Sequence, residues 1–159
     1  MIYVTVERLV KRRPEVVWEV LCDVSSLTSW SEGIVEATIA SEEKKGAGMV
    51  VAIVGRTKGK SVRVKCEVTA WRENALLALE ADTPNRSFFH RATLDATPEG
   101  TRLGVYAEIM FKDKISGFLK HPGGIFEPSP ADLERQRMYE RSVDALVKRI
   151  ESFSVVPYR

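Results

Sequence analysis

Alternation of apolar and polar residues predicts strands over most of the first 111 positions. Ile2 to Val10 alternates, with Val4 and Val6 on one side and Thr5 on the other, and its β-branched residues favour a strand. After Gly33 the two-residue period returns between turn signals that are spaced as in a sheet. The six strands expected there are Ile34 to Ala40, Gly48 to Gly55, Lys60 to Trp71, Leu76 to Asp82, Ser87 to Thr97, and Thr101 to Phe111.

The longest of these strands has one apolar and one polar face. In the stretch Lys60 to Trp71, the residues Val62, Val64, Cys66, Val68 and Ala70 share one face, and charged or hydroxyl residues share the other. A sheet with one solvated face is antiparallel. The inward faces together supply Val62, Val64, Val68, Leu77, Leu79, Phe88, Leu94, Leu103, Val105 and Ile109. These residues form a larger apolar surface than the apolar stripe of one helix can cover.

Two short helices are expected between the first strand and the others. The first begins at Pro14, because proline suits the first helical position. Its apolar residues follow the i, i+3, i+4, i+7 spacing: Val17, Val20, Leu21 and Val24. Ser25 or Ser26 is expected to cap a second short turn that ends near Trp30, and Gly33 ends this segment.

One long helix is predicted from Ser129 to about Phe153. Ser129 can cap it, Pro130 suits its first position, and Asp132 completes a capping-box start. One stripe of the helix contains Asp132, Gln136, Tyr139, Val143, Leu146, Val147, Ile150 and Phe153. The second half of this stripe is aliphatic and can seal a core. The first half is polar, which indicates either a partly wet cavity or the edge of the domain.

The segment Lys112 to Pro130 is irregular in pattern. It combines a Gly/Pro-rich turn with apolar side chains, among them Phe118, that need cover. It is expected to be either a lid over a cavity or a fixed connection across the end of the sheet, and the sequence leaves both alternatives open.

Composition narrows the class of protein. The chain has 159 residues, of which 44% are hydrophobic, and a formal net charge of +2, so we expect one globular domain over residues 1–159 and no nucleic-acid partner. No apolar run approaches the roughly 18 residues of a spanning helix, and no signal peptide is evident. We therefore expect a cytoplasmic monomer or homodimer without stable membrane insertion. Asn74, Asn85 and Gln136 are its only amide side chains, and this scarcity suggests a thermophilic source.

Residues that could carry chemistry are few. His90 and His121 are the only histidines, and no His/Cys/carboxylate group has metal-ligand spacing, so no metal site and no cofactor are expected. Cys22 and Cys66 are expected to be buried thiols, not a bridge. His90 occupies the inward register of its strand and needs a partner, which is either a neighbouring side chain such as Tyr139 or a ligand.

The order of strand, two short helices, six strands and a long helix resembles the START-like or Bet v 1-like superfamily, and within it the polyketide cyclase/dehydrase and lipid-transport group. The resemblance covers almost the whole chain and depends on the segment Pro14 to Asp23, on Trp30, on the turn Gly100 to Arg102 and on the terminal helix. It implies an α+β helix-grip fold, in which a curved seven-stranded antiparallel sheet wraps around the C-terminal helix and encloses a cavity.

The resemblance implies an apolar or amphipathic small molecule as the partner. The first function is a binding or carrier protein for a lipid-, polyketide- or aromatic-like ligand. The alternative is an aromatase/cyclase-like or dehydratase-like enzyme, and a weaker third possibility is a member that binds other proteins. Because no acid and base pair is apparent, we favour binding. The expected ligand-binding residues are Trp30, Val64, Cys66, Phe88, His90, Leu94, Phe118, Gln136, Tyr139 and Val143.

Overall fold

Seven strands form one antiparallel sheet in the order β1-β7-β6-β5-β4-β3-β2 in the computed structural model of the chain, which describes residues 1–112 and 130–153. The strands are β1 (Ile2–Val10), β2 (Ile34–Ile39), β3 (Val50–Thr57), β4 (Lys60–Arg72), β5 (Leu76–Asp82), β6 (Arg86–Thr97) and β7 (Gly100–Phe111). Every neighbouring pair is antiparallel. The predicted fold class is therefore confirmed, and the predicted strand boundaries differ from these by a residue or two.

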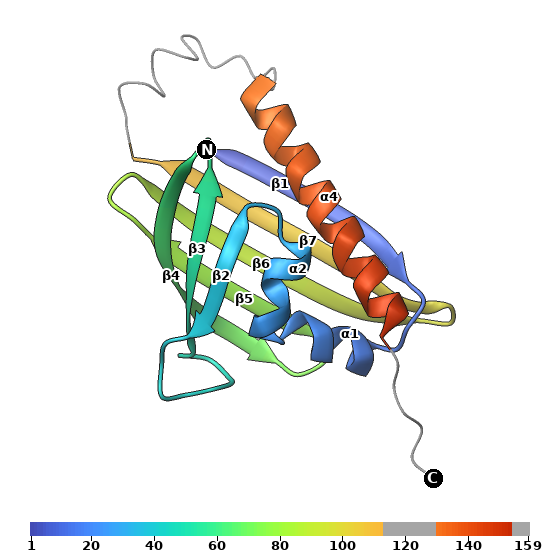
Figure 1. Cartoon of the computed structure of the whole chain (residues 1–159). Helices are drawn as coiled ribbons and strands as arrows, with labels where there is room; N and C mark the ends of the chain where they lie inside the picture. Colours follow the sequence, from blue (N-terminus) through green and yellow to red (C-terminus); the bar gives the residue numbers. More distant parts are fainter. Residues whose placement is uncertain (113–129, 154–159) are drawn as a thin grey trace.

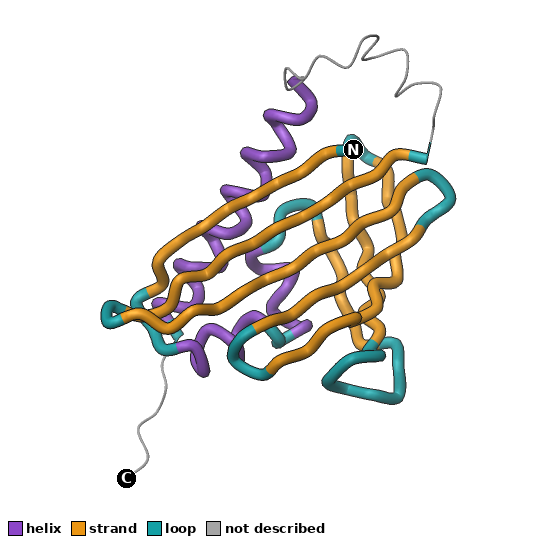
Figure 2. Tube along the Cα trace, turned by 180° about the vertical axis from the view of Figure 1, so that it is seen from behind, coloured by secondary structure: helices purple, strands orange, loops and turns teal. Residues whose placement is uncertain are grey.

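The helices all lie on one side of the sheet, as Figures 1 and 2 show from opposite directions. They are α1 (Pro14–Leu21), the 3-10 turn η1 (Val24–Ser26), α2 (Leu27–Trp30) and α4 (Pro130–Ser152). The expected helix start at Ser129 and positions 113–129 of the segment predicted as a lid or loop, including Phe118, lie outside the described residues. In the described part, no helix is both long enough and apolar enough to cross a membrane.

The long helix α4 runs beside the edge strand β1 (Figure 1). The side-chain amide of Gln136 donates to the main-chain oxygen of Thr5 at 2.9 Å, and Arg8 Nε lies 2.7 Å from Asp144 Oδ1. These contacts occupy polar groups along a sheet edge that would otherwise be open to pairing with another chain. The helix therefore protects one edge of the sheet as well as covering its inner face.

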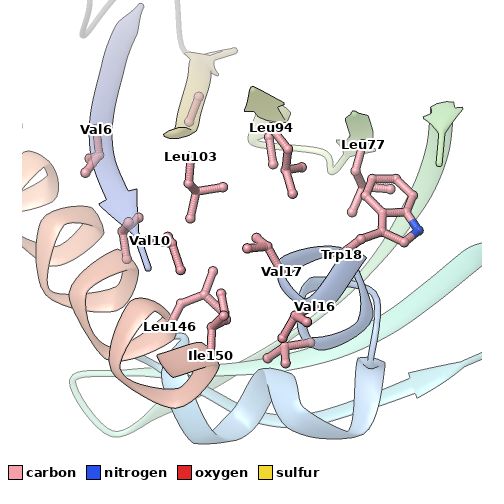
Figure 3. Packing of buried hydrophobic residues seen from close by; sticks show 14 of the residues in the cluster. Val6, Val10, Val16, Val17, Trp18, Leu77, Leu94, Leu103, Leu146 and Ile150 are labelled. Atoms are coloured by element: carbon pink, nitrogen blue, oxygen red, sulfur yellow. The ribbon is translucent and has the colours of Figure 1, made fainter. Parts of the chain in front are cut away.

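The core lies at the end of the sheet where α4 finishes and α1 packs (Figure 3). On the helix, Val143 is 3% exposed, Leu146 is 1% exposed and Ile150 is fully buried. They contact a cluster whose labelled members in Figure 3 are Val6, Val10, Val16, Val17, Trp18, Leu77, Leu94 and Leu103. The prediction that the second half of the α4 stripe seals a core is confirmed.

A β-bulge in β4 corrects the predicted inner face. The register against β5 shifts between Val68 and Ala70, so Trp71 pairs with Leu77, which faces the core. The Trp71 ring packs edge-on against Trp18, with 5.1 Å between centroids. The predicted alternation was wrong beyond Val68, because an extra residue in one strand moves every later side chain to the other face.

Two further expectations were wrong in detail. Val62 was predicted to line the interior but is 52% exposed, and its neighbours Ser61 and Arg63 at that end of β4 are exposed as well. The expected cap by Ser25 or Ser26 is absent. Asp23 caps η1 instead, its carboxylate accepting from the Ser25 main-chain N–H at 3.1 Å, while the Ser26 hydroxyl donates to the Asp23 main-chain oxygen at 2.8 Å.

Candidate functional site

The inner face of the sheet is unevenly covered. Under α4, the side chains of Val4 on β1 and Ala107 on β7 are buried, at 1% and 0% exposure. Further across the sheet, several inward apolar side chains remain only half-buried: Ile53, Val64, Cys66, Leu79 and Phe88. Apolar side chains that point to the interior and keep accessible surface indicate incomplete filling on the side of β3 to β6.

His90 and Tyr139 meet on this part of the inner face. His90 on β6 pairs with Leu79 on β5 and with Ala107 on β7, and its Nε2 lies 2.5 Å from the hydroxyl of Tyr139 on α4. Phe88 stacks on the imidazole with 6.3 Å between ring centroids. Tyr139 is therefore the hydrogen-bond partner of the inward-facing His90. Of the two partners that the sequence allowed, a neighbouring side chain or a ligand, the structure shows the side chain.

Burial keeps both members of this pair neutral near pH 7. Burial lowers the pKa of His90 to about 4 and raises the pKa of Tyr139 to about 12, because the charged forms lose hydration. An efficient general acid or base has a pKa near the working pH. The pair is thus suited to hold a fixed hydrogen bond, and it is poorly matched to proton transfer at neutral pH.

Cys66 and Trp30 add two more groups to the interior. Burial raises the pKa of the Cys66 thiol to about 11, and Cys66 lies near enough to Tyr139 to affect the pKa of that phenol. Trp30 extends from α2 against the edge of the core. Its indole Nε1 is buried and has no hydrogen-bond partner within the described part of the chain. Buried donors ordinarily have an acceptor, so this N–H is an exception that calls for an explanation.

The remaining predicted residues lie in three different surroundings. Val64 is half-buried beside Ile53 on the incompletely filled face. Leu94 and Val143 are buried in the close-packed core. Gln136 is bonded to Thr5 and to Glu140 Oε1 at 3.0 Å, so the structure does not bring it to the His90–Tyr139 pair.

Sequence reasoning missed Arg135. This residue precedes Tyr139 by one helical turn and is half-buried, and its Nε is enclosed without a hydrogen-bond partner among the described residues. The spacing of four residues from Tyr139 was the signal that could have found it. A charged residue at the flank of a helix stripe more commonly lies in solvent, which is why it was overlooked.

A separate hollow of about 530 Å³ lies beside the β6–β7 hairpin, and its lining includes Thr97, Glu7 and Arg102. Glu7 and Arg102 form an ion pair, with 3.3 Å between Glu7 Oε1 and Arg102 Nε. None of the predicted site residues lines it. Within residues 1–112 and 130–153, no group of three His, Cys, Asp or Glu side chains could hold a metal ion.

Comparisons with known proteins agree on fold and family. Residues 1–151 match the family model described as polyketide cyclase / dehydrase and lipid transport. No curated protein sequence matches the chain. Among solved structures, TTHA0849 from Thermus thermophilus is similar, with 18% identity and a TM-score of 0.73 over 93% of this chain and 96% of that one.

Two other solved structures are similar over nearly their whole length. The Zhui aromatase/cyclase from Streptomyces sp. R1128 has 17% identity and a TM-score of 0.71, covering 94% of this chain and 93% of that one. A START superfamily protein from Mycobacterium smegmatis has 15% identity and a TM-score of 0.65, with 95% of each chain covered. At these identities the likeness establishes the fold alone.

Proposed function

Because the chain belongs to the polyketide cyclase/dehydrase and lipid transport family, we propose that it is a binding or carrier protein for an apolar or amphipathic small molecule. The ligand lies in a cavity between α4 and the inner face of β3 to β6. The proposal places the protein in the cytoplasm as a monomer or homodimer. Neither a cofactor nor a metal is needed for this role.

One observation carries the proposal most directly. The indole N–H of Trp30 is buried without a partner in the described part of the chain, and Trp30 packs against the same core cluster as the half-buried Ile53 and Leu79. Leaving a buried donor unpaired costs about 1–3 kcal/mol. An amphipathic ligand would cover the apolar wall and offer this donor an acceptor. Trp30, Val64, Cys66, Phe88, His90 and Tyr139 are the residues we assign to the binding site.

An enzyme of the aromatase/cyclase or dehydratase kind is the second candidate. The fold shared with the Zhui aromatase/cyclase and the short bond between His90 and Tyr139 favour it. The pKa values of both groups, about 4 and about 12, argue against it, since neither would exchange a proton readily near pH 7. We therefore place binding first.

Titration with the neutral dye Nile red tests the binding proposal. We expect saturable binding at one dye per chain with a blue shift in emission, because the dye enters an apolar interior. Val64→Phe should abolish this binding by filling the space. Val62→Phe is the matched control, because Val62 lies on the same strand and is 52% exposed, and it should leave binding unchanged. Dye binding that does not saturate, or that survives Val64→Phe, would contradict the proposal.

Native mass spectrometry separates the carrier from the enzyme. The gently purified protein is examined for a co-purifying small molecule, which is then released and reapplied to ligand-free protein. A carrier returns the molecule with unchanged mass. A dehydratase or an aromatising cyclase returns a product that has lost water, and the binding-only proposal would then be wrong.

A further inference from the structure

Two arginines lie at the end of the interior where α4 begins. Arg135 is half-buried on α4, one turn before Tyr139, so the two side chains are neighbours along the helix. Arg86 is the first residue of β6 and shares the inward register of that strand with Phe88 and His90. The two arginines therefore flank the polar pair on the helix side and on the sheet side.

The guanidinium of Arg135 has one hydrogen-bond donor that no described residue satisfies. Its Nε is buried and donates to no acceptor there, and the ion pairs formed within the described ranges do not include it. A guanidinium carries five N–H donors in a fixed planar arrangement. Buried guanidinium N–H groups are ordinarily matched by acceptors, so the enclosed Nε of this half-buried arginine leaves room for a further acceptor.

The local electrostatics also favour an anion. Burial lowers the pKa of Arg135, and the positive charge of Arg86 lowers it further, while Tyr139 and Asp132 act in the opposite direction and more weakly. Arg86 also places its guanidinium over the ring of Phe111, 5.2 Å from the ring centroid. Two like charges near one another in a partly desolvated region repel, and a negative charge bound between them would stabilise both.

We propose that Arg135 and Arg86 form a subsite for the carboxylate of the ligand, so that the bound molecule is an apolar acid. This inference rests on the proposed binding function. The carboxylate would accept paired hydrogen bonds from the half-buried Arg135, a geometry that guanidinium favours. Arg86, which is exposed, would attract the acid at the entrance. The apolar part of the ligand then lies along Phe88 and Val64.

Three probes with the same apolar chain test this subsite: dodecanoic acid, dodecan-1-ol and dodecyltrimethylammonium. Their dissociation constants are measured at pH 8 and low salt by displacement of Nile red. We expect the acid to bind at least tenfold more tightly than the alcohol, and the cation to bind most weakly. In Arg135→Gln the affinity for the acid should fall to that for the alcohol, and the affinity for the alcohol should change little. In Arg86→Gln the preference for the acid should be reduced.

The controls separate a binding role from a structural one. Arg137→Gln removes an exposed arginine from the same helix and should leave all three affinities unchanged. The thermal midpoint of Arg135→Gln should not fall, because the change removes a half-buried charge whose Nε has no acceptor among the described residues. Arg135→Lys should keep part of the preference for the acid.

The two proposals fail in different ways. Equal affinity for acid and alcohol in the unaltered protein, or an acid preference that persists in Arg135→Gln, overturns the carboxylate subsite and leaves the binding function standing. Absence of binding by all three probes and by Nile red overturns the binding function itself.

Discussion

At the scale of single residues, His90 and Tyr139 define the polar centre of the interior. Their 2.5 Å contact joins a ring nitrogen and a phenol, and burial keeps both groups uncharged near neutrality. A neutral hydrogen bond in a partly dry region is strong while it is intact, and it leaves a costly unpaired group when it is broken. Stability should therefore depend on both partners and on pH.

The pH dependence follows from the lowered pKa of His90. The folded protein holds His90 neutral down to about pH 4, whereas the unfolded chain protonates it near pH 6.5, so the unfolded state binds more protons between these values. The stabilisation is complete above about pH 6.5 and is lost as pH falls to about 4, by on the order of 3 kcal/mol. Urea denaturation from pH 7.5 to 4.5 measures it. His90→Gln should flatten the curve, and an equally steep loss in that variant would show that another group is responsible.

Tyr139→Phe should lower the free energy of unfolding by about 1–3 kcal/mol, because the His90 nitrogen loses its partner inside the protein. The apolar ring remains, so packing changes little. Adding His90→Leu in a double-mutant cycle should recover part of this loss, since neither polar group then remains unpaired. Strictly additive losses would show that the two side chains are not coupled.

At the scale of elements, the β6–β7 hairpin and the second half of α4 hold the closed end together. The hairpin passes close to the end of β1, where the Thr101 hydroxyl donates to the Arg12 main-chain oxygen at 2.7 Å. The helix contributes Leu146 and Ile150 to the same region. The side chains at this end of the sheet are closely packed, whereas the inward apolar side chains of β3 to β6 are only half-buried.

Gly100 allows the close approach of the hairpin to β1. Its φ is +148°, and a Cβ there would lie 2.1 Å from the main-chain oxygen of Val10. We expect Gly100→Ala to cost more than about 2 kcal/mol, because backbone atoms must move. Gly46→Ala is the control, with φ +92° and no atom within 4 Å of the added carbon, and it should cost only about 1 kcal/mol. Chemical denaturation measures the free energy of unfolding of both variants. Equal losses of stability would show that the positive φ alone, and not the close contact with Val10, causes the destabilisation at Gly100.

The two leucines of α4 test how the helix is anchored. Leu146 is 1% exposed, whereas Leu133, near the start of the helix, is 44% exposed. Leu146→Ala should reduce the free energy of unfolding by about 2–5 kcal/mol through lost burial and a cavity. Leu133→Ala should stay within about 0.5 kcal/mol of the unaltered protein. Urea midpoints measure both, and a large effect at Leu133 would mean that the start of α4 is anchored as firmly as its end.

At the scale of the whole molecule, a close-packed end adjoins an incompletely filled side. A ligand that binds only the folded state stabilises it by mass action, by about 2.7 kcal/mol at 100 times its dissociation constant. For a domain of this size we expect saturating dodecanoic acid to raise Tm by roughly 5–10 °C. Differential scanning calorimetry measures the shift. Val64→Phe should remove it, and a shift retained in that variant would place the ligand outside the proposed cavity.

The sequence determined what depends on local pattern. Period-two alternation, the proline start of α1, the turn glycines and the long helical stripe predicted the seven strands and the C-terminal helix, because strand and helix periods are properties of consecutive residues. Their arrangement as one curved sheet around the helix was implied by the family resemblance. The inward register of His90 was readable for the same reason. The thermophilic source suggested by the scarcity of amides stays a prediction.

Only the tertiary structure decided how distant side chains meet. His90 and Tyr139 are 49 residues apart, and the Arg86 charge reaches Arg135 only because the start of β6 and the start of α4 lie at the same end of the molecule. The β4 bulge likewise depends on the pairing partner β5, so alternation along β4 could not reveal it. The Trp30 Nε1 and Arg135 Nε donors are buried without an acceptor within the described ranges. Whether an acceptor lies near a buried donor depends on the packing of every surrounding element, so the sequence could not show it.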